Sequence, residues 1–119
     1  MRIVLVDDDQ LVVDALGFAL RDAGYDVWHS TLPELAMARL RAEGADLVVS
    51  DVRLQGADGS AFIRDVRAGF PHCPIIAISG GGGSLEKARA AGASLCLQKP
   101  FTGRALLAAI SDLVASRDA

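Results

Sequence analysis

Two kinds of segment alternate along the whole chain, and this alternation constrains the fold more than any other feature. Five short runs rich in branched apolar residues are each followed by a segment whose apolar residues recur at helical spacing. An apolar run without alternation is typical of a strand buried on both faces of a sheet, and recurrence every three or four residues is typical of a helix. The predicted strands cover residues 3–6, 26–30, 47–49, 74–78 and 95–98, of which the second is the weakest.

The helix boundaries carry signals of their own. Gly24 and Gly44 are natural ends for the first two helices, because glycine readily adopts the backbone conformation that ends a helix. Thr31 followed by Glu34 has the pattern of a capping box at the start of the second helix. A glycine-rich loop at 80–83 precedes the fourth helix. The predicted helices cover residues 11–23, 31–43, 59–68, 84–91 and 102 onward, with Asp9, Thr31, Ser84 and Thr102 as predicted caps.

A strand followed each time by a helix favours a parallel sheet that is covered by helices on both faces. We therefore predict an α/β fold: a three-layer sandwich with a five-stranded parallel sheet in the flavodoxin-like order 2-1-3-4-5. The chain is long enough for one domain with its own core, and it shows no internal repeat or linker. We expect residues 1–119 to form a single domain, with no output domain in this chain.

Composition argues against several classes of protein. The net charge of −3 provides no basic face for direct contact with nucleic acid. No apolar run approaches the roughly 18 residues of a membrane span, and the start of the chain lacks the features of a signal peptide. The two cysteines, Cys73 and Cys96, form no metal-ligand or disulfide pattern. We therefore expect a cytoplasmic protein with reduced thiols and no membrane insertion.

Charged and reactive side chains stand where the predicted strands end. The third strand leads to Asp51, the fourth to Ser79 and the fifth to Lys99. In open parallel sheets, ligands bind beyond the carboxyl ends of the strands, where the strand order reverses. We therefore expect one site that combines carboxylates, a hydroxyl and an ammonium group. The first strand adds three aspartates, Asp7, Asp8 and Asp9, the last of which is the predicted helix cap.

These residue types together suit a cation and an anion bound side by side. Clustered carboxylates repel one another, and their oxygens are the ligands that hard ions such as Mg²⁺ prefer. A metal alone needs neither Lys99 nor Ser79, whereas both are ordinary ligands of a phosphoryl group. Asp51 is the candidate acceptor, because a carboxylate can act as a nucleophile toward phosphorus while the cations neutralise the phosphoryl oxygens.

The chain resembles the response-regulator receiver domains of two-component signalling, in the CheY-like superfamily, along almost its full length. Each motif alone is weak, but together and in this order they are specific. The motifs are IVLVDDD at 3–9, LVVSDVR at 47–53, GADG at 56–59, PIIAIS at 74–79 and QKPF at 98–101.

The resemblance implies a role for each residue of the site. Asp51 would accept the phosphoryl group, and Ser79 and Lys99 would contact its oxygens. A cis peptide bond between Lys99 and Pro100 would aim the lysine into the site.

The resemblance also implies a metal site and partners. Mg²⁺ would be held by Asp8 directly, by Asp7 through water, by Asp51, and by the backbone carbonyl of Arg53. A sensor histidine kinase or a histidine phosphotransfer protein would supply the phosphoryl group. An unknown downstream protein would bind a face formed by the last two helices and the fifth strand. Such a domain is not an enzyme, although it assists its own phosphorylation and dephosphorylation.

Two alternative functions remain open. Asp7 and Asp9 form a D-x-D motif, which resembles the nucleophile motif of haloacid-dehalogenase-type phosphohydrolases. However, Gln10 follows in place of the expected glycine and threonine, and 119 residues leave no room for a substrate cap. The second alternative is a receiver-like module that binds proteins and is never phosphorylated. It stays open because Gln55 and Cys96 stand where the family usually carries a proline and an aromatic residue.

Overall fold

The structure contains the predicted parallel sheet. The computed structural model describes residues 1–54, 57–80 and 83–118. Five strands lie parallel in the order β2-β1-β3-β6-β7, and a separate small hairpin accounts for the labels β4 and β5. Counted among the strands of the main sheet alone, this is the predicted order 2-1-3-4-5. The strands are β1 (Arg2–Val6), β2 (Asp26–Ser30), β3 (Leu47–Asp51), β6 (Ile75–Ser79) and β7 (Leu95–Gln98).

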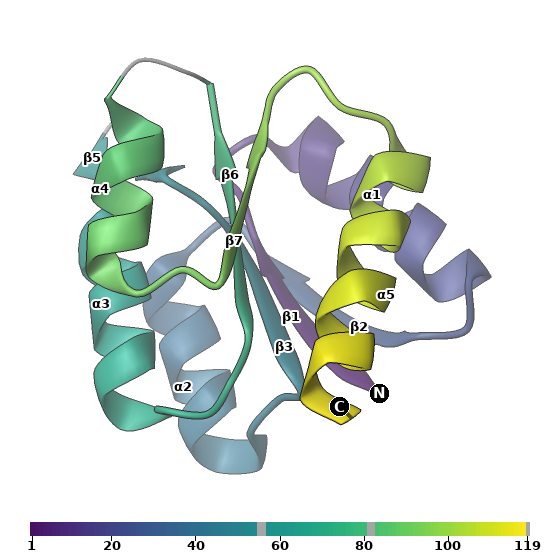
Figure 1. Ribbon diagram of the computed structural model, residues 1–119, viewed down its shortest axis with the longest axis horizontal. Helices are drawn as coiled ribbons and strands as arrows, with labels where there is room; N and C mark the ends of the chain where they lie inside the picture. Colours follow the sequence, from purple (N-terminus) through teal and green to yellow (C-terminus); the bar gives the residue numbers. More distant parts are fainter. Residues whose placement is uncertain (55–56, 81–82, 119) are drawn as a thin grey trace.

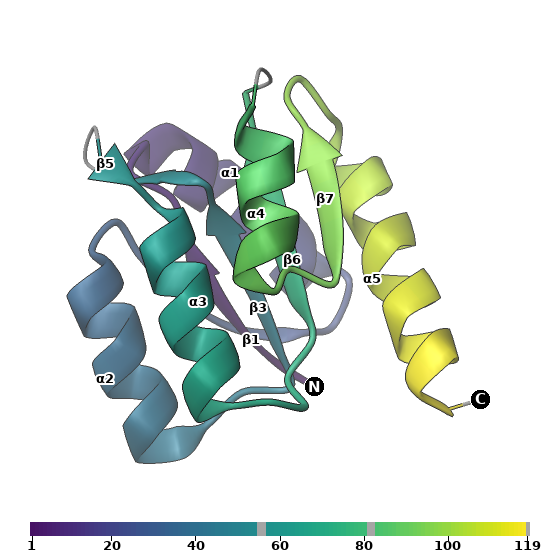
Figure 2. The same ribbon diagram turned by 60° about the vertical axis from the view of Figure 1, so that its left-hand side comes forward.

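Helices cover both faces of the sheet and complete three layers, with α1 and α5 on one face and α2, α3 and α4 on the other (Figures 1 and 2). Neighbouring residues of β1 belong to different cores, because successive side chains of a strand point to opposite faces. Leu5 packs with Leu16 and Ile110 on the side of α1 and α5, whereas Val6 packs with Leu40 and Ile63 on the other side. No helix in the described part of the chain is both long and apolar enough to cross a membrane. The helices are α1 (Gln10–Asp22), α2 (Pro33–Glu43), α3 (Ser60–Gly69), α4 (Ser84–Ala91) and α5 (Gly103–Asp118).

Two of the four predicted helix caps are confirmed. An Asp9 carboxylate oxygen accepts a hydrogen bond from the backbone N–H of Leu11 at 3.0 Å, at the start of α1. The Thr102 hydroxyl accepts one from the backbone N–H of Ala105 at 3.1 Å, at the start of α5. Each bond satisfies a backbone donor that has no partner within its own helix.

The other two caps are wrong. The N-cap of α2 is Leu32 rather than Thr31, and α2 begins with Pro33, whose fixed φ suits the first helical position. In α4, Gly83 occupies the N-cap and Ser84 is the first helical residue, with no side-chain capping bond in the described part of the helix. A short sequence pattern places a helix start only to within a residue or two, and here the cap of α2 lies one residue later than predicted and the cap of α4 one residue earlier.

A short antiparallel hairpin follows β3 and was not predicted. It consists of β4 (Arg53–Leu54) and β5 (Ala57–Asp58), each too short to leave a periodic sequence pattern. Gln55 lies outside the described residues, as do residues 81 and 82 of the glycine-rich loop. The glycine-rich loop therefore stays a prediction at these two positions.

Candidate functional site

The carboxyl ends of four strands bring the predicted site residues to one edge of the sheet. Asp7 follows β1, Asp51 ends β3, Ser79 ends β6 and Lys99 follows β7. In the pairing of β3 with β6, Asp51 lies opposite Ile78, the residue just before Ser79. Residues that are up to 92 positions apart in the chain thus meet at one place, as the location of ligand sites in open parallel sheets predicts.

Lys99 lies against two buried carboxylates. Its Nζ is 2.9 Å from Oδ2 of Asp51 and 3.6 Å from Oδ2 of Asp7. The other oxygen of each carboxylate accepts a backbone hydrogen bond: Asp51 Oδ1 from Arg53 N–H at 2.9 Å, and Asp7 Oδ1 from Asp9 N–H at 3.0 Å. Both carboxylates are therefore held in one orientation, with the second oxygen turned toward Lys99.

Three carboxylates form a cluster that could hold a hard cation. Asp7, Asp8 and Asp51 each offer an oxygen, and these oxygens lie within 4.8 Å of one another. Asp7 and Asp51 are buried, whereas Asp8 is exposed. Asp7 Oδ2 is fully buried and has no hydrogen-bond partner among the described residues. A buried carboxylate oxygen without a partner is costly, and a cation bound to the cluster would remove that cost.

The pKa of Asp7 differs from that of an ordinary carboxylate because of its surroundings in the site. Burial in the first place, together with the nearby charge of Asp51, raises the pKa of Asp7 to about 6 against the opposing effects of the Asp9 N–H and Lys99. Burial acts to lower the pKa of Lys99, but its hydrogen bond to Asp51 and the charges of both carboxylates outweigh burial, so that this pKa is raised. Lys99 is therefore a firmly charged ammonium that balances the carboxylates.

Asp7→Asn should stabilise the metal-free protein at pH 7 by up to about 3 kcal/mol, since each unit of pKa shift corresponds to about 1.4 kcal/mol. The pKa of Asp7 is higher in the folded protein than in the unfolded chain, so the folded protein takes up this proton first. This group consequently makes the wild type more stable as pH falls from about 7 toward 4, the reverse of the usual behaviour of a carboxylate. Urea denaturation of both proteins at several pH values, without divalent metal, measures the difference between them.

The exposed Asp65 on α3 provides the matched control. Asp65→Asn should leave the free energy of unfolding within about 0.5 kcal/mol of the wild type at every pH. A difference between Asp7→Asn and the wild type that does not change with pH would contradict the assignment of the raised pKa to Asp7.

Ser79 is buried at the end of β6, and its hydroxyl makes a hydrogen bond with the hydroxyl of Ser84, the first residue of α4. Its backbone carbonyl accepts a hydrogen bond from the N–H of Lys99 at 2.7 Å. The sequence singled out Ser79 as a ligand and Ser84 only as a cap. The contact between them had no local signal, because it depends on where α4 lies against the sheet.

Two further expectations concern the backbone. The peptide bond between Lys99 and Pro100 is cis, as the resemblance implied. The Arg53 side chain is exposed, and its backbone N–H orients Asp51. The role of the Arg53 carbonyl as a metal ligand stays a prediction.

Gly59 shapes the segment after Asp51, and the sequence argument named it only as part of a motif. Its N–H donates to the carbonyl of Val52, and a Cβ at this position would lie 2.5 Å from that carbonyl oxygen. It would also lie 2.8 Å from the carbonyl oxygen of Asp51. Only a residue without a side chain allows the chain to fold back this closely onto the residue that follows Asp51.

Gly59→Ala should lower the free energy of unfolding by about 2–3 kcal/mol, because the added Cβ meets backbone atoms that cannot turn away. Gly69→Ala is the matched control, since a Cβ there meets no atom of the described residues within 4 Å and Gly69 lacks a positive φ. Its effect should stay within about 0.5 kcal/mol. Urea denaturation measures both, and equal losses in the two variants would contradict the close approach.

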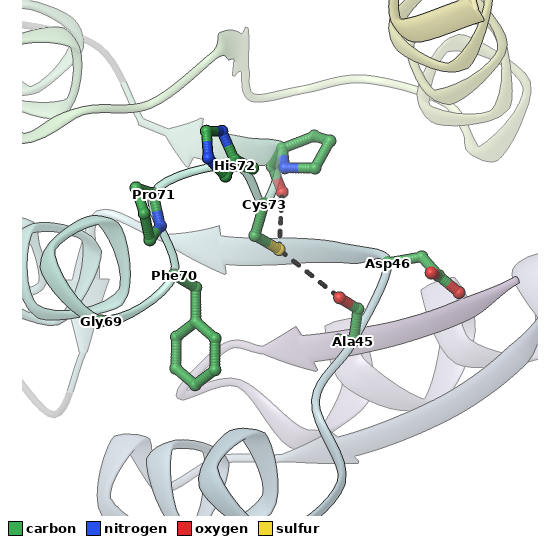
Figure 3. Close-up of a pocket in the computed structure, with 8 residues that line it drawn as sticks. Ala45, Asp46, Gly69, Phe70, Pro71, His72 and Cys73 are labelled. Atoms are coloured by element: carbon green, nitrogen blue, oxygen red, sulfur yellow. Dashed lines mark hydrogen bonds between the residues drawn. The ribbon is translucent and has the colours of Figure 1, made fainter.

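A pocket of about 350 Å³ lies at the opposite edge of the sheet, before the first residues of β3 and β6. Figure 3 shows the Cys73 thiol inside it, directed toward the carbonyls of Ala45 and Pro74 at 3.8 and 3.6 Å. The pocket is remote in the fold from the carboxylate cluster. It is lined by Ala45, Asp46, Gly69, Phe70, Pro71, His72, Cys73 and Pro74.

Comparison with known proteins agrees with the observed fold and with the geometry of the carboxylate site. The family model for the response regulator receiver domain matches residues 3–111. The response regulator protein FleR of Pseudomonas aeruginosa is 35% identical over 117 residues, which are 96% of this chain but only 24% of FleR. The chain therefore spans about a quarter of the length of that relative.

Two solved structures share the fold at higher coverage. A putative response regulator from Chloroflexus aurantiacus is 30% identical with a TM-score of 0.88, covering 96% of this chain and 97% of its own. The BeF3-activated receiver domain of DrrB is 26% identical with a TM-score of 0.85, and the shares covered are 96% and 97%. With a family match over nearly its whole length and the strand order of that fold, the chain belongs to the response regulator receiver domain family, the phosphoacceptor module of two-component signalling.

Proposed function

We propose that this domain is a phosphorylation switch in which Asp51 accepts a phosphoryl group from a phosphohistidine. The donor would be a sensor histidine kinase or a histidine phosphotransfer protein. The observation that carries this proposal is the position of Asp51. It is buried, it is held 2.9 Å from the Lys99 ammonium on one side, and it contributes to the acidic cluster on the other. A carboxylate placed between a lysine and a candidate cation site suits attack on a phosphoryl group.

Each residue of the site would have a different role in the transfer of the phosphoryl group. An Asp51 oxygen forms the bond to phosphorus while the donor's phosphorus–nitrogen bond breaks, and the imidazole leaves with the bonding electron pair. The Arg53 N–H holds the other oxygen of Asp51, so the attacking carboxylate is oriented before the donor arrives. Lys99 then exchanges a carboxylate partner for a phosphoryl oxygen, and the Ser79 hydroxyl donates to another.

Mg²⁺ is the cofactor that we propose, held by Asp7, Asp8, Asp51 and the carbonyl of Arg53. Three carboxylate oxygens within 4.8 Å, one of them buried without a hydrogen-bond partner among the described residues, suit a small hard cation. When bound, the ion would neutralise negative charge on the phosphoryl oxygens. Protons compete for Asp7, whose pKa is raised to about 6, so Mg²⁺ affinity should fall as the pH drops below that value.

The output would be a changed surface rather than catalysis on a separate substrate. Phosphoryl contacts to Ser79 and Lys99 lie next to α4, β7 and α5, and we propose that a downstream protein binds this face. The domain would assist its own phosphorylation and dephosphorylation and would act in the cytoplasm as a single folded unit, residues 1–119, without direct contact to nucleic acid.

The test is the intact mass of the protein after incubation with Mg²⁺ and a small phosphodonor. We expect the wild type to gain one phosphoryl group and Asp51→Asn to gain none. Asp65→Asn, at an exposed position of α3, is the matched control and should be labelled like the wild type.

Other outcomes would select the alternatives. No labelling of the wild type, together with no Mg²⁺ binding by titration, would favour a module that is never phosphorylated. Labelling that survives in Asp51→Asn but disappears in Asp7→Asn would favour the hydrolase.

A further inference from the structure

The outer face of α2 is apolar, although this helix lies on the surface of the domain. Ala36 and Leu40 are buried in the core beneath the helix. At about 3.6 residues per turn, Leu35, Ala38 and Ala42 lie on the side of α2 that faces away from those two residues. All three are exposed, and Leu35 is 51% exposed. We call them the outer stripe of α2. A surface helix normally has polar residues on this side, and a helix that is apolar all round is normally covered.

Two opposite charges stand on one flank of the outer stripe. Glu34 belongs to the first turn of α2 and Arg41 to the last, and their spacing of about two turns puts them on the same side of the helix. Both are exposed, and neither forms an ion pair with another described residue. Arg39 on the other flank differs, because it pairs with Glu43 at 2.7 Å and lies 6.0 Å from the centre of the Trp28 ring. One flank therefore presents an acid at one end and a base at the other, both available to a partner.

We propose that the outer stripe of α2 binds the same stripe of a second copy of this chain, with the two helices antiparallel about a two-fold axis. Such an axis places the start of one helix beside the end of the other, so Glu34 of each copy faces Arg41 of the other. Ala38 lies near the axis, where its small side chain lets the helices approach closely. Leu35 of each copy then packs against Ala42 of the other. The face is therefore complementary to itself in both charge and shape.

The exposed apolar residues of α1 lack this self-complementarity. Leu11 and Phe18 are 79% and 73% exposed, so they are larger and more exposed than the residues of the outer stripe. However, the exposed Asp14 stands about midway between them along the helix. A two-fold axis at that point would bring the Asp14 carboxylates of two copies together, and like charges oppose association. Helix α2 is therefore the better candidate for contact between copies.

The outer stripe is separate from the surfaces used in the proposed function. It contains no residue of the phosphorylation site, and α3 lies between α2 and α4 (Figure 2). Association through α2 therefore leaves α4, β7 and α5 uncovered. The inference does not rest on the proposed function, and Asp51→Asn should self-associate like the wild type.

Charge reversal tests the pairing of Glu34 with Arg41. A dimer of Glu34→Arg, or of Arg41→Glu, would bring like charges together at both contacts, so self-association of each variant should weaken by at least about tenfold. An equimolar mixture of the two variants restores opposite charges at both contacts and should associate within about threefold of the wild type. Sedimentation equilibrium at protein concentrations up to about 1 mM measures these constants, since small interfaces associate weakly. Because the mixture regains association only if both variants are folded, it also excludes misfolding as the cause of the losses.

Replacement of an apolar residue tests the stripe itself. Leu35→Lys should also weaken association by at least about tenfold, because it places a charge inside the contact. Phe18→Lys is the matched control on α1 and should associate like the wild type. A wild type that stays monomeric at every concentration would overturn the inference, and so would a mixture of charge variants that associates no better than either variant alone. Loss of association in Phe18→Lys but not in Leu35→Lys would also overturn it, by assigning the contact to α1.

Discussion

Lys99→Met is expected to slow the phosphorylation of Asp51 by about 10²–10³-fold, the usual cost of removing a preorganised group that faces developing charge. The same substitution should strengthen Mg²⁺ binding. The Lys99 ammonium lies 2.9 Å from Asp51 and 3.6 Å from Asp7. It therefore neutralises part of the negative charge that would otherwise attract a metal ion. Removing it leaves the carboxylate cluster with one more uncompensated negative charge, and we expect Mg²⁺ affinity to rise about tenfold.

The labelling rate should fall while the Mg²⁺ affinity rises, and a general loss of structure would not produce this combination. The rate of labelling follows from intact mass against time at saturating Mg²⁺, and Mg²⁺ affinity follows from calorimetric titration. Lys87→Met is the matched control, because Lys87 is the other lysine of the chain and is exposed on α4. It should change neither quantity appreciably. Slower labelling together with weaker Mg²⁺ binding in Lys99→Met would mean that the lysine mainly supports the structure of the site.

Arg67→Met should lower the free energy of unfolding by about 2–4 kcal/mol, because it removes several hydrogen bonds of the guanidinium, among them the partly buried ones to Cys73 and Gly92. The carbonyls of Pro71, Cys73 and Gly92 accept from Arg67 in the folded protein, and methionine replaces only the aliphatic stem. Arg67→Lys should recover little of the loss, since a single ammonium cannot reach carbonyls that a planar guanidinium spans. Urea denaturation in the presence of Mg²⁺ measures these differences.

Arg64→Met provides the control on the same helix, because Arg64 is exposed on α3. We expect its effect to stay within about 0.5 kcal/mol of the wild type. Similar losses from Arg64→Met and Arg67→Met would contradict the view that Arg67 joins three segments of the fold.

The fold followed from the sequence because its signals are local and repeated. Each strand is an apolar run buried on both faces, and each helix has its own periodic pattern, so one misplaced boundary does not alter the architecture. The errors fell where the signal spans only a few residues. Thr31 and Ser84 have the residue type of a cap but stand one position away from the observed cap residues, Leu32 and Gly83. The hairpin after β3 has two-residue strands and no periodic pattern at all.

The composition of the site also followed from the sequence. Each residue of the site ends or follows a strand, namely Asp7, Asp51, Ser79 and Lys99. The residues at the carboxyl ends of parallel strands lie at the same edge of the sheet. Their positions in the chain therefore sufficed to predict that they meet and which chemistry they suit.

The energetics and the couplings were decided only by the tertiary structure. The raised pKa of Asp7 depends first on its burial, which is a property of the packed molecule and not of the residue. The contact of Ser79 with Ser84 and the contacts of Arg67 depend on how α4 lies against α3 and the sheet. Local sequence determines which elements form, because helix and strand patterns act over a few residues. Distances between side chains on different elements arise only when those elements pack.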